Sequence, residues 1–171
     1  MKHSDITRRA DQVLAKAKIS APKVPVLDIA QSLGIKVRLG VLPDDLSGFL
    51  VHEKDAVVIG VNSLHPKPRQ AFTVAHELGH YHLHPSTNFV DRKLIYFRDA
   101  RSTGAVDKKE IEANQFAADL LMPERFLHHE LKGQTVDLED EDRLANLATT
   151  FGVSNQALMF RLINLNLARQ R

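Results

Sequence analysis

The spacing of hydrophobic residues predicts a chain of helices interrupted by one short group of strands. Apolar residues recur at helical intervals near the N-terminus, and shorter apolar runs of strand length follow. Residues 52–55, HEKD, have the polar composition of a turn between two strands. The expected helices of this half are 7–19 and 26–33, and the expected strands are 35–39, 48–51 and 56–61.

After Asn62 the pattern becomes helical. Pro68 suits the first turn of a helix, and Pro85 ends that helix. Residues 86–107 show no period apart from a short apolar run at 94–97. Four further helices are expected, at 108–122, 124–131, 140–151 and 154–167.

These elements predict an α+β fold. We expect a small antiparallel sheet of about three strands, packed on a mainly helical domain with further helices at the C-terminus. The expected division is a domain of residues 1–130, with the N-terminal helices and the sheet, and a helical extension of residues 131–171.

Composition narrows the class of protein. The 171 residues are 43% hydrophobic, which is ample for one core, and the absence of cysteine excludes disulfides and thiolate metal ligands. The 23 basic and 21 acidic residues are mixed along the chain and give a net charge of +2, which argues against a dominant nucleic-acid-binding surface. No apolar run approaches a membrane span, and the first residues lack the apolar stretch of a signal peptide, so a cytoplasmic location is expected.

The helix between Pro68 and Pro85 contains an unusual group of histidines, in the segment FTVAHELGHYHLH. His76, Glu77 and His80 form an H-E-x-x-H pattern. Residues four apart on a helix are separated by about 40° and one turn, so both imidazoles can reach one ion. Glu77 is rotated by about 100° from His76, which suits a base that acts on a water at the metal. The pattern predicts a metal site.

Other side chains of this helix are candidates for the rest of the site. Arg69, Thr73 and His84 lie on the same face as the two imidazoles, within about 80° of arc. His84 either lines the site or caps the end of the helix. His82 lies outside the arc, so we expect a surface or packing histidine there.

Catalytic zinc usually takes a third protein ligand, which in a chain without cysteine is His, Asp or Glu. The helix 108–122 is the best source. Glu112 has apolar neighbours that draw it towards the interior, although a solvated Glu112 paired with Lys108 fits the spacing as well. Glu110 and Asp119 are the rival ligands. Asp119 is also a candidate for orienting an imidazole, with surface exposure as the alternative.

The segment FTVAHELGHYHLH followed by EIEANQFAADLLMP resembles the ImmA/IrrE family of bacterial metallopeptidases. Members share a helix written approximately FTxAHELGHxxLH and a later helix E-A-N-x-F-A-A-x-L-L-M-P. LPDDLSGFL and IGVN also resemble the family's sheet region, so the resemblance covers roughly residues 22–130. It implies a zincin-like zinc metalloendopeptidase with one zinc per chain. His76, His80 and Glu112 would be the ligands and Glu77 the catalytic base.

The resemblance also implies a protein substrate, a helix-turn-helix transcriptional repressor whose cleavage relieves the repression of stress or mobile-element genes. Three side chains are candidates for contacts with the substrate or the oxyanion: His84, Tyr96 and Arg69. An exposed strand within 48–61 would hold an extended peptide by β-augmentation. The run 94–97 either lies over the cleft or packs in the core.

Residues 147–165 have the outline of a helix-turn-helix, with Ser154 as the N-cap of the second helix. Arg161 is the only basic residue of the second helix, and the next one in the chain is Arg169. We therefore expect a helical hairpin packed on the core and no direct DNA binding. The alternative function is a non-catalytic zinc-binding regulator, or a toxin–antitoxin partner, of a helix-turn-helix protein. An intact Glu77 favours the enzyme, because a scaffold needs no base.

Overall fold

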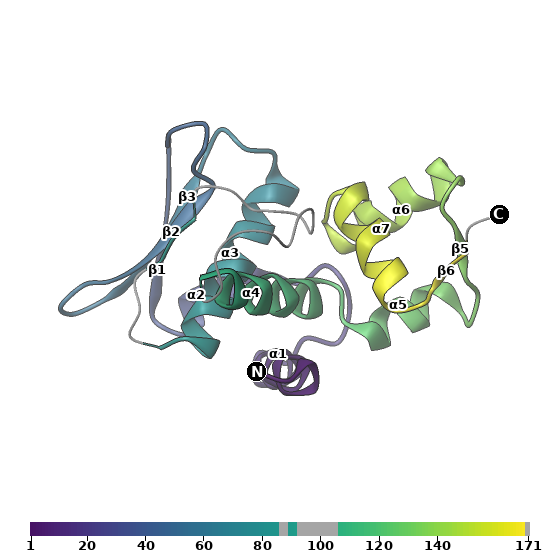
Figure 1. Ribbon diagram of the computed structural model, residues 1–171, viewed down its shortest axis with the longest axis horizontal. Helices are drawn as coiled ribbons and strands as arrows, with labels where there is room; N and C mark the ends of the chain where they lie inside the picture. The colour runs from purple at the N-terminus through teal and green to yellow at the C-terminus, as the bar shows by residue number, and fades with distance from the viewer. Residues whose placement is uncertain (86–88, 92–105, 170–171) are drawn as a thin grey trace.

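The computed structural model describes residues 1–85, 89–91 and 106–169 (Figure 1). The helices in this part of the chain are α1 (His3–Lys16), α2 (Val26–Ser32), α3 (Lys67–Leu83), α4 (Val106–Leu121), α5 (Glu124–Leu131), α6 (Glu141–Phe151) and α7 (Asn155–Asn164). The strands are β1 (Ile35–Gly40), β2 (Gly48–His52), β3 (Val57–Asn62), β4 (Phe89–Asp91), β5 (Val136–Asp137) and β6 (Ala168–Arg169). The α+β class is confirmed. Tyr96 and the run 94–97 lie outside the described residues.

One sheet has the strand order β1-β3-β2-β4. β2 and β3 form the expected antiparallel hairpin, which Glu53 closes by donating its backbone N–H to the carbonyl of Ala56. β3 then lies between β1 and β2, and it pairs with β1 in parallel. The sheet is therefore mixed and not antiparallel as predicted, because β1 joins the hairpin at the outer edge of β3 and runs in the same direction as β3.

This strand order changes the expectation for peptide binding. β3 pairs with β1 and β2, while β2 pairs with β3 and β4. In the described part of the chain, the sheet edges are thus β1 and β4. The expectation that a strand within 48–61 offers a free edge is wrong for β3, which is paired on two sides, and for residues 48–50 of β2, which pair with β4.

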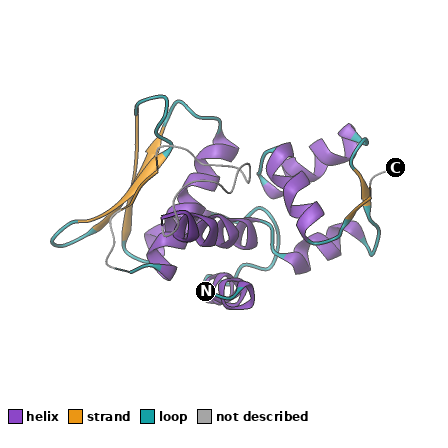
Figure 2. Ribbon diagram, viewed as in Figure 1, coloured by secondary structure: helices purple, strands orange, loops and turns teal. Residues whose placement is uncertain are grey.

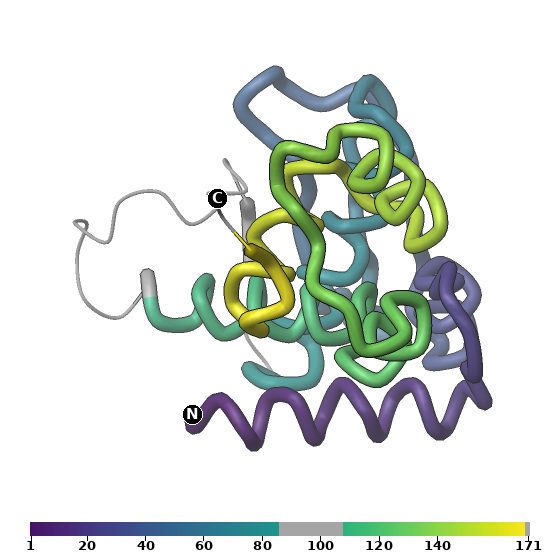
Figure 3. The backbone as a smooth tube through the Cα atoms, turned by 90° about the vertical axis from the view of Figure 1, so that its right-hand side faces the viewer, coloured from purple at the N-terminus to yellow at the C-terminus, as the bar shows by residue number. Residues whose placement is uncertain are grey.

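The helices pack on one side of this sheet, as Figure 2 shows. α3 contacts β2 and β3, α4 packs on α3, and α1 packs on α4, along the base of the view in Figure 3. Fully buried side chains from the sheet, α3 and α4 pack together to form the core between these layers. They include Leu50, Ile59, Leu78, Phe116 and Leu120. Among the described residues, no helix combines the length and the apolar character that a bilayer crossing requires.

The N-terminal helix differs most from its expected bounds. α1 occupies His3–Lys16 and not 7–19. It begins early because Ile6 and Ala10 already belong to its buried stripe. It ends early because Lys18 adopts a left-handed backbone conformation, with φ of 56°.

α3 and α4 approach each other closely where Gly79 faces Ala113. A Cβ atom on Gly79 would lie 3.0 Å from both the Cα and the carbonyl oxygen of Ala113. Because glycine has no side chain, the two backbones meet at this point. The crossing lies directly beside His80, and it sets the position of α4 relative to the histidine helix.

The C-terminal hairpin is attached to this core through Arg161 of α7. Its side chain is only 4% exposed, it pairs with Asp119 of α4 at 2.8 Å, and its Nε donates to the carbonyl of Met122 at 3.1 Å. Ser154 caps α7 as expected, by accepting from the N–H of Ala157 at 3.2 Å. The one basic residue that a DNA-reading α7 would present is therefore buried.

Candidate metal centre

The histidine helix places His76 and His80 side by side in the interior. The two residues are 1% and 0% exposed. Their rings meet edge to face with centroids 4.6 Å apart, and their Nε2 atoms are separated by 3.0 Å. The spacing of four residues on α3 thus brings both ring nitrogens to one point, as predicted.

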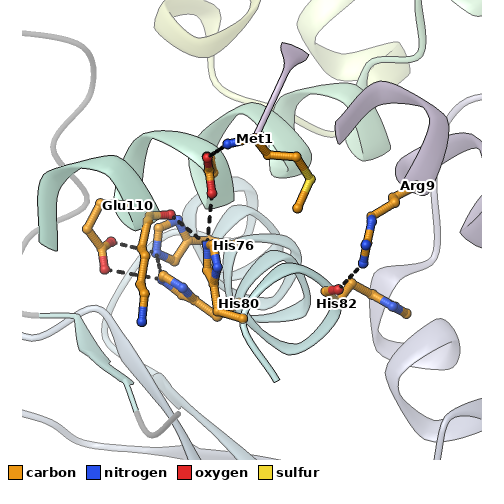
Figure 4. A network of polar contacts seen from close by, with 9 residues as sticks. Met1, Arg9, His76, His80, His82 and Glu110 are labelled. Carbon is orange, nitrogen blue, oxygen red and sulfur yellow. Dashed lines mark hydrogen bonds and ion pairs between the residues drawn. The ribbon is translucent and has the colours of Figure 1, made fainter. Parts of the chain in front are cut away.

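The third group at this point is Glu110 of α4. Its Oε2 lies 3.1 Å from Nε2 of His76, and its Oε1 lies 3.2 Å from Nε2 of His80 (Figure 4). The side chain of Glu110 is 31% exposed, so the cluster is open to solvent on this side. Two imidazole nitrogens and a carboxylate therefore converge, with ligand atoms within 4.8 Å of one another.

This geometry fits a tetrahedral metal ion. Zinc bonds to nitrogen and oxygen ligands are about 2.0 to 2.2 Å long, so the ligand atoms of a tetrahedral site lie about 3.3 Å apart. The separations of 3.0, 3.1 and 3.2 Å between His76, His80 and Glu110 are close to that value. Three protein ligands also leave a fourth position for water or substrate.

The protonation of the cluster suits a cation as well. Burial lowers the pKa of His80 to about 4, so its imidazole is neutral at pH 7. Burial alone would raise the pKa of Glu110, but the imidazoles of His76 and His80 beside it outweigh that effect and hold the pKa at about 2. Neutral imidazoles and an ionised carboxylate are the forms that bind a metal.

Asn114, which the sequence analysis missed, orients one of the imidazoles. Its Oδ1 accepts a hydrogen bond from Nδ1 of His76 at 2.9 Å, and the residue is buried. With the proton on Nδ1, the lone pair of Nε2 points at the cluster. Asn114 lies one helical turn after Glu110. This i, i+4 relation to Glu110 was the signal in the sequence that would have identified it.

Glu77 is fully buried beside the cluster, against the first residue of β2. A Cβ atom on Gly48 would lie 3.7 Å from Oε1 of Glu77 and 2.4 Å from Cγ2 of Thr73. The strand can run this close to α3 only because Gly48 has no side chain. The sheet thus forms one wall around the carboxylate that the H-E-x-x-H pattern singled out as a base.

Glu112, the third ligand implied by the family resemblance, contacts groups other than His76 and His80. Its carboxylate pairs with the α-amino group of Met1 and lies 3.6 Å from Nε2 of His84. Residues two apart on a helix point about 200° apart, so Glu110 and Glu112 cannot both face the same imidazoles. The structure brings Glu110 to His76 and His80, and it brings Glu112 to the end of α3.

The other candidates take separate positions. The ring of His84 lies 5.6 Å from that of His80, and its Nε2 donates to the carbonyl of Lys109 at 3.3 Å. Arg69 donates to the hydroxyl of Ser47 at 3.0 Å. Asp119 is neither a ligand of the cluster nor exposed, because it is buried in its pair with Arg161. His82 is a packing histidine, stacked on Phe116 with centroids 5.6 Å apart.

Comparison with known proteins adds to this geometry. Residues 30–162 match the family described as the IrrE N-terminal-like domain, Peptidase_M78. The chain is 33% identical over 119 residues to immunity region protein 2 of Bacillus phage phi105. The aligned region is 70% of this chain and 69% of that protein. The chain is 32% identical over 100 residues to Metallopeptidase ImmA of Bacillus subtilis strain 168, covering 55% and 54% of the two chains.

A solved structure shares the fold. A Mycobacterium tuberculosis transcriptional regulator superposes with a TM-score of 0.64 and 22% identity, over 93% of this chain and 46% of that one. The chain thus spans about half the length of this regulator and of Metallopeptidase ImmA.

Proposed function

Because the chain belongs to the IrrE N-terminal-like (Peptidase_M78) family, and thus contains an ImmA/IrrE-like metallopeptidase domain, we propose that it is a zinc-dependent metalloendopeptidase. The observation that carries the proposal is the convergence of His76, His80 and Glu110, with Glu77 buried next to them. Two histidines and a glutamate are a common ligand set of catalytic zinc in peptidases.

In this proposal Glu110 is the third ligand, and Asn114 keeps His76 in the tautomer that binds. Zinc, when bound, acts as a Lewis acid that polarises the scissile carbonyl and makes a water molecule more acidic. Glu77 takes the proton of the attacking water and gives it to the leaving amine. Its position beside the cluster and away from bulk water suits this role.

The proposed substrate is a helix-turn-helix transcriptional repressor. Support comes from the family resemblance and from the burial of Arg161, which leaves α7 poorly suited to reading DNA itself. The protein would therefore act on a regulator of transcription by cutting it, and direct DNA binding is not part of the proposal.

The test is cleavage of a candidate helix-turn-helix repressor from the same genome. The zinc-loaded protein is incubated with the purified repressor, and products are identified by mass spectrometry, with Glu77→Gln as the matched control. We expect one defined cut, slowed by roughly 10² to 10⁴ in the variant, because glutamine cannot accept the proton. Zinc content should stay the same, because Glu77 is not a ligand.

Two results would contradict the proposal. Equal cleavage by Glu77→Gln would point to another base or to a contaminating protease. Tight binding of the repressor without any cut by the zinc-loaded protein would favour the non-catalytic regulatory partner.

A further inference from the structure

A groove lies between α1 and α2, separate from the metal centre. Its volume is about 590 Å³, and its walls come from α1, α2 and the last turn of α3. The lining residues are Arg8, Arg9, Gln12, Val13, Lys16, Ala17, Ile29, Ser32, Leu33 and His82. A volume of this size falls within the range of pockets that bind small molecules.

The charge of the groove has one sign. Arg8, Arg9 and Lys16 line it, and no carboxylate is among the lining residues that the structure describes. Of the two acidic residues of α1, Asp11 pairs with Arg125 of α5 at 2.6 Å, while Asp5 pairs with Arg8 at 2.7 Å and offsets the charge of that arginine. Arg9 and Lys16 therefore supply the positive charge of the groove, which favours an anionic ligand.

Arg9 is an exposed residue at the edge of the groove, and one hydrogen bond holds its guanidinium in place. Its Nη1 donates to the backbone carbonyl of His82 at 2.7 Å, a contact drawn in Figure 4. A guanidinium has five N–H donors, so this bond fixes the group while others remain for a ligand.

The remaining wall is apolar. Val13 of α1 and Ile29 of α2 are buried side chains in the lining, and Leu33 continues their surface. Cationic groups beside an apolar wall match a molecule with a phosphate at one end and a flat, weakly polar ring at the other. Arginine binds phosphate oxygens in a bidentate manner.

We propose that this groove binds a phosphorylated small molecule of about the size of a nucleoside monophosphate. The site does not depend on the proposed peptidase activity. It adjoins the catalytic region because His82 follows His80 by two residues on α3. A ligand here would contact the last turn of the helix that carries both imidazoles.

The test is isothermal titration calorimetry of the full chain with adenosine monophosphate and, separately, inorganic phosphate. Titrations are made with both metal-free and zinc-loaded protein, because a phosphate can also bind zinc. We expect the nucleotide to bind metal-free protein with a Kd below about 1 mM. The double variant Arg9→Gln/Lys16→Gln should weaken binding by about tenfold or more.

Two further variants sharpen the result. Lys36→Gln/Arg38→Gln removes the same charge from exposed positions on β1, so it should leave the Kd within about twofold. Gln12→Glu places a carboxylate in the groove and keeps the bond from Arg9 to His82. It should weaken binding even if the double variant proves unstable.

Several outcomes would overturn the proposal. Equal losses in the two double variants would mean a general charge effect. Loss of binding in His76→Ala, but not in the groove variants, would place the nucleotide at the metal centre. Binding of a polyglutamate peptide without binding of either phosphate compound would make the groove a site for an acidic protein segment.

Discussion

At the scale of single residues, the question that matters most is which glutamate of α4 binds the metal. We expect Glu110→Ala to lose zinc, because it removes the carboxylate that lies 3.1 and 3.2 Å from the two imidazoles. Glu112→Ala should keep about one zinc per chain, because Glu112 faces Met1 and His84. Elemental analysis of both purified variants measures this. The reverse result would restore Glu112 as the ligand.

A second prediction at this scale concerns Asn114, a positioning residue. Asn114→Ala removes the acceptor for Nδ1 of His76, so the ring is no longer held in one tautomer and orientation. We expect zinc affinity to fall by about 10- to 100-fold, measured by competition with a chelating dye. Asn114→Asp, which keeps an acceptor oxygen, should recover much of the loss. Unchanged affinity in the alanine variant would exclude this role.

At the scale of elements, the crossing of α3 and α4 determines where Glu110 lies relative to the two imidazoles. Alanine has a higher helix propensity than glycine by about 1 kcal/mol, so Gly79→Ala would stabilise an isolated α3. In the protein the new methyl group meets the backbone of Ala113 at 3.0 Å, so α4 must move. We expect a net loss of stability of about 1 to 3 kcal/mol and weaker zinc binding, since Glu110 moves with α4.

Urea unfolding of the metal-free Gly79→Ala protein measures the loss of stability, and a zinc titration of the same variant measures the loss of zinc affinity. The exposed Gly133→Ala is not a suitable control, because Gly133 has a φ of 77°. Gly40→Ala is suitable, because no atom lies within 4 Å of its Cβ position and its φ is not positive. A Gly79→Ala protein that is more stable and binds zinc normally would show that the crossing tolerates a wider separation.

At the scale of the whole molecule, α4 connects the parts. Its first turns carry Glu110 and Asn114 to α3, and its last turns carry Asp119 to α7 and α1. Asp119 accepts from Thr7 at 2.9 Å and pairs with Arg161 at 2.8 Å. The C-terminal hairpin and the N-terminal helix are therefore joined to the helix that completes the metal centre.

This arrangement predicts a large effect from a residue remote from the metal. Arg161→Ala leaves the buried carboxylate of Asp119 without its cation, which should destabilise the fold by about 3 to 5 kcal/mol. The double variant Arg161→Met/Asp119→Leu should recover most of that loss, because no buried charge remains. Urea unfolding of the wild type, Arg161→Met, Asp119→Leu and the double variant measures the coupling, and Arg161→Ala is unfolded in the same way. A loss below about 1 kcal/mol in Arg161→Ala would contradict the structure.

The features that follow from neighbours in the sequence were predictable. The hairpin of β2 and β3, the cap at Ser154 and the meeting of His76 and His80 on one face depend on intervals of a few residues. Helical and strand geometry relate such residues in the same way in any fold. The order of the helices and of the first three strands, with most of their bounds, could be read from the chain for the same reason, whereas the short strands β4, β5 and β6 were not predicted.

Contacts between distant segments could not be read in this way. Which face of α4 meets α3 depends on the rotation of one helix against the other, which the close approach at Gly79 and Ala113 sets. That rotation brings Glu110 and Asn114 to the imidazoles, turns Glu112 aside and buries Asp119 against Arg161. The parallel pairing of β1 with β3 likewise depends on which of the two outer edges of the hairpin β1 joins. Local periodicity carries no information on either choice, so only the tertiary packing decides them.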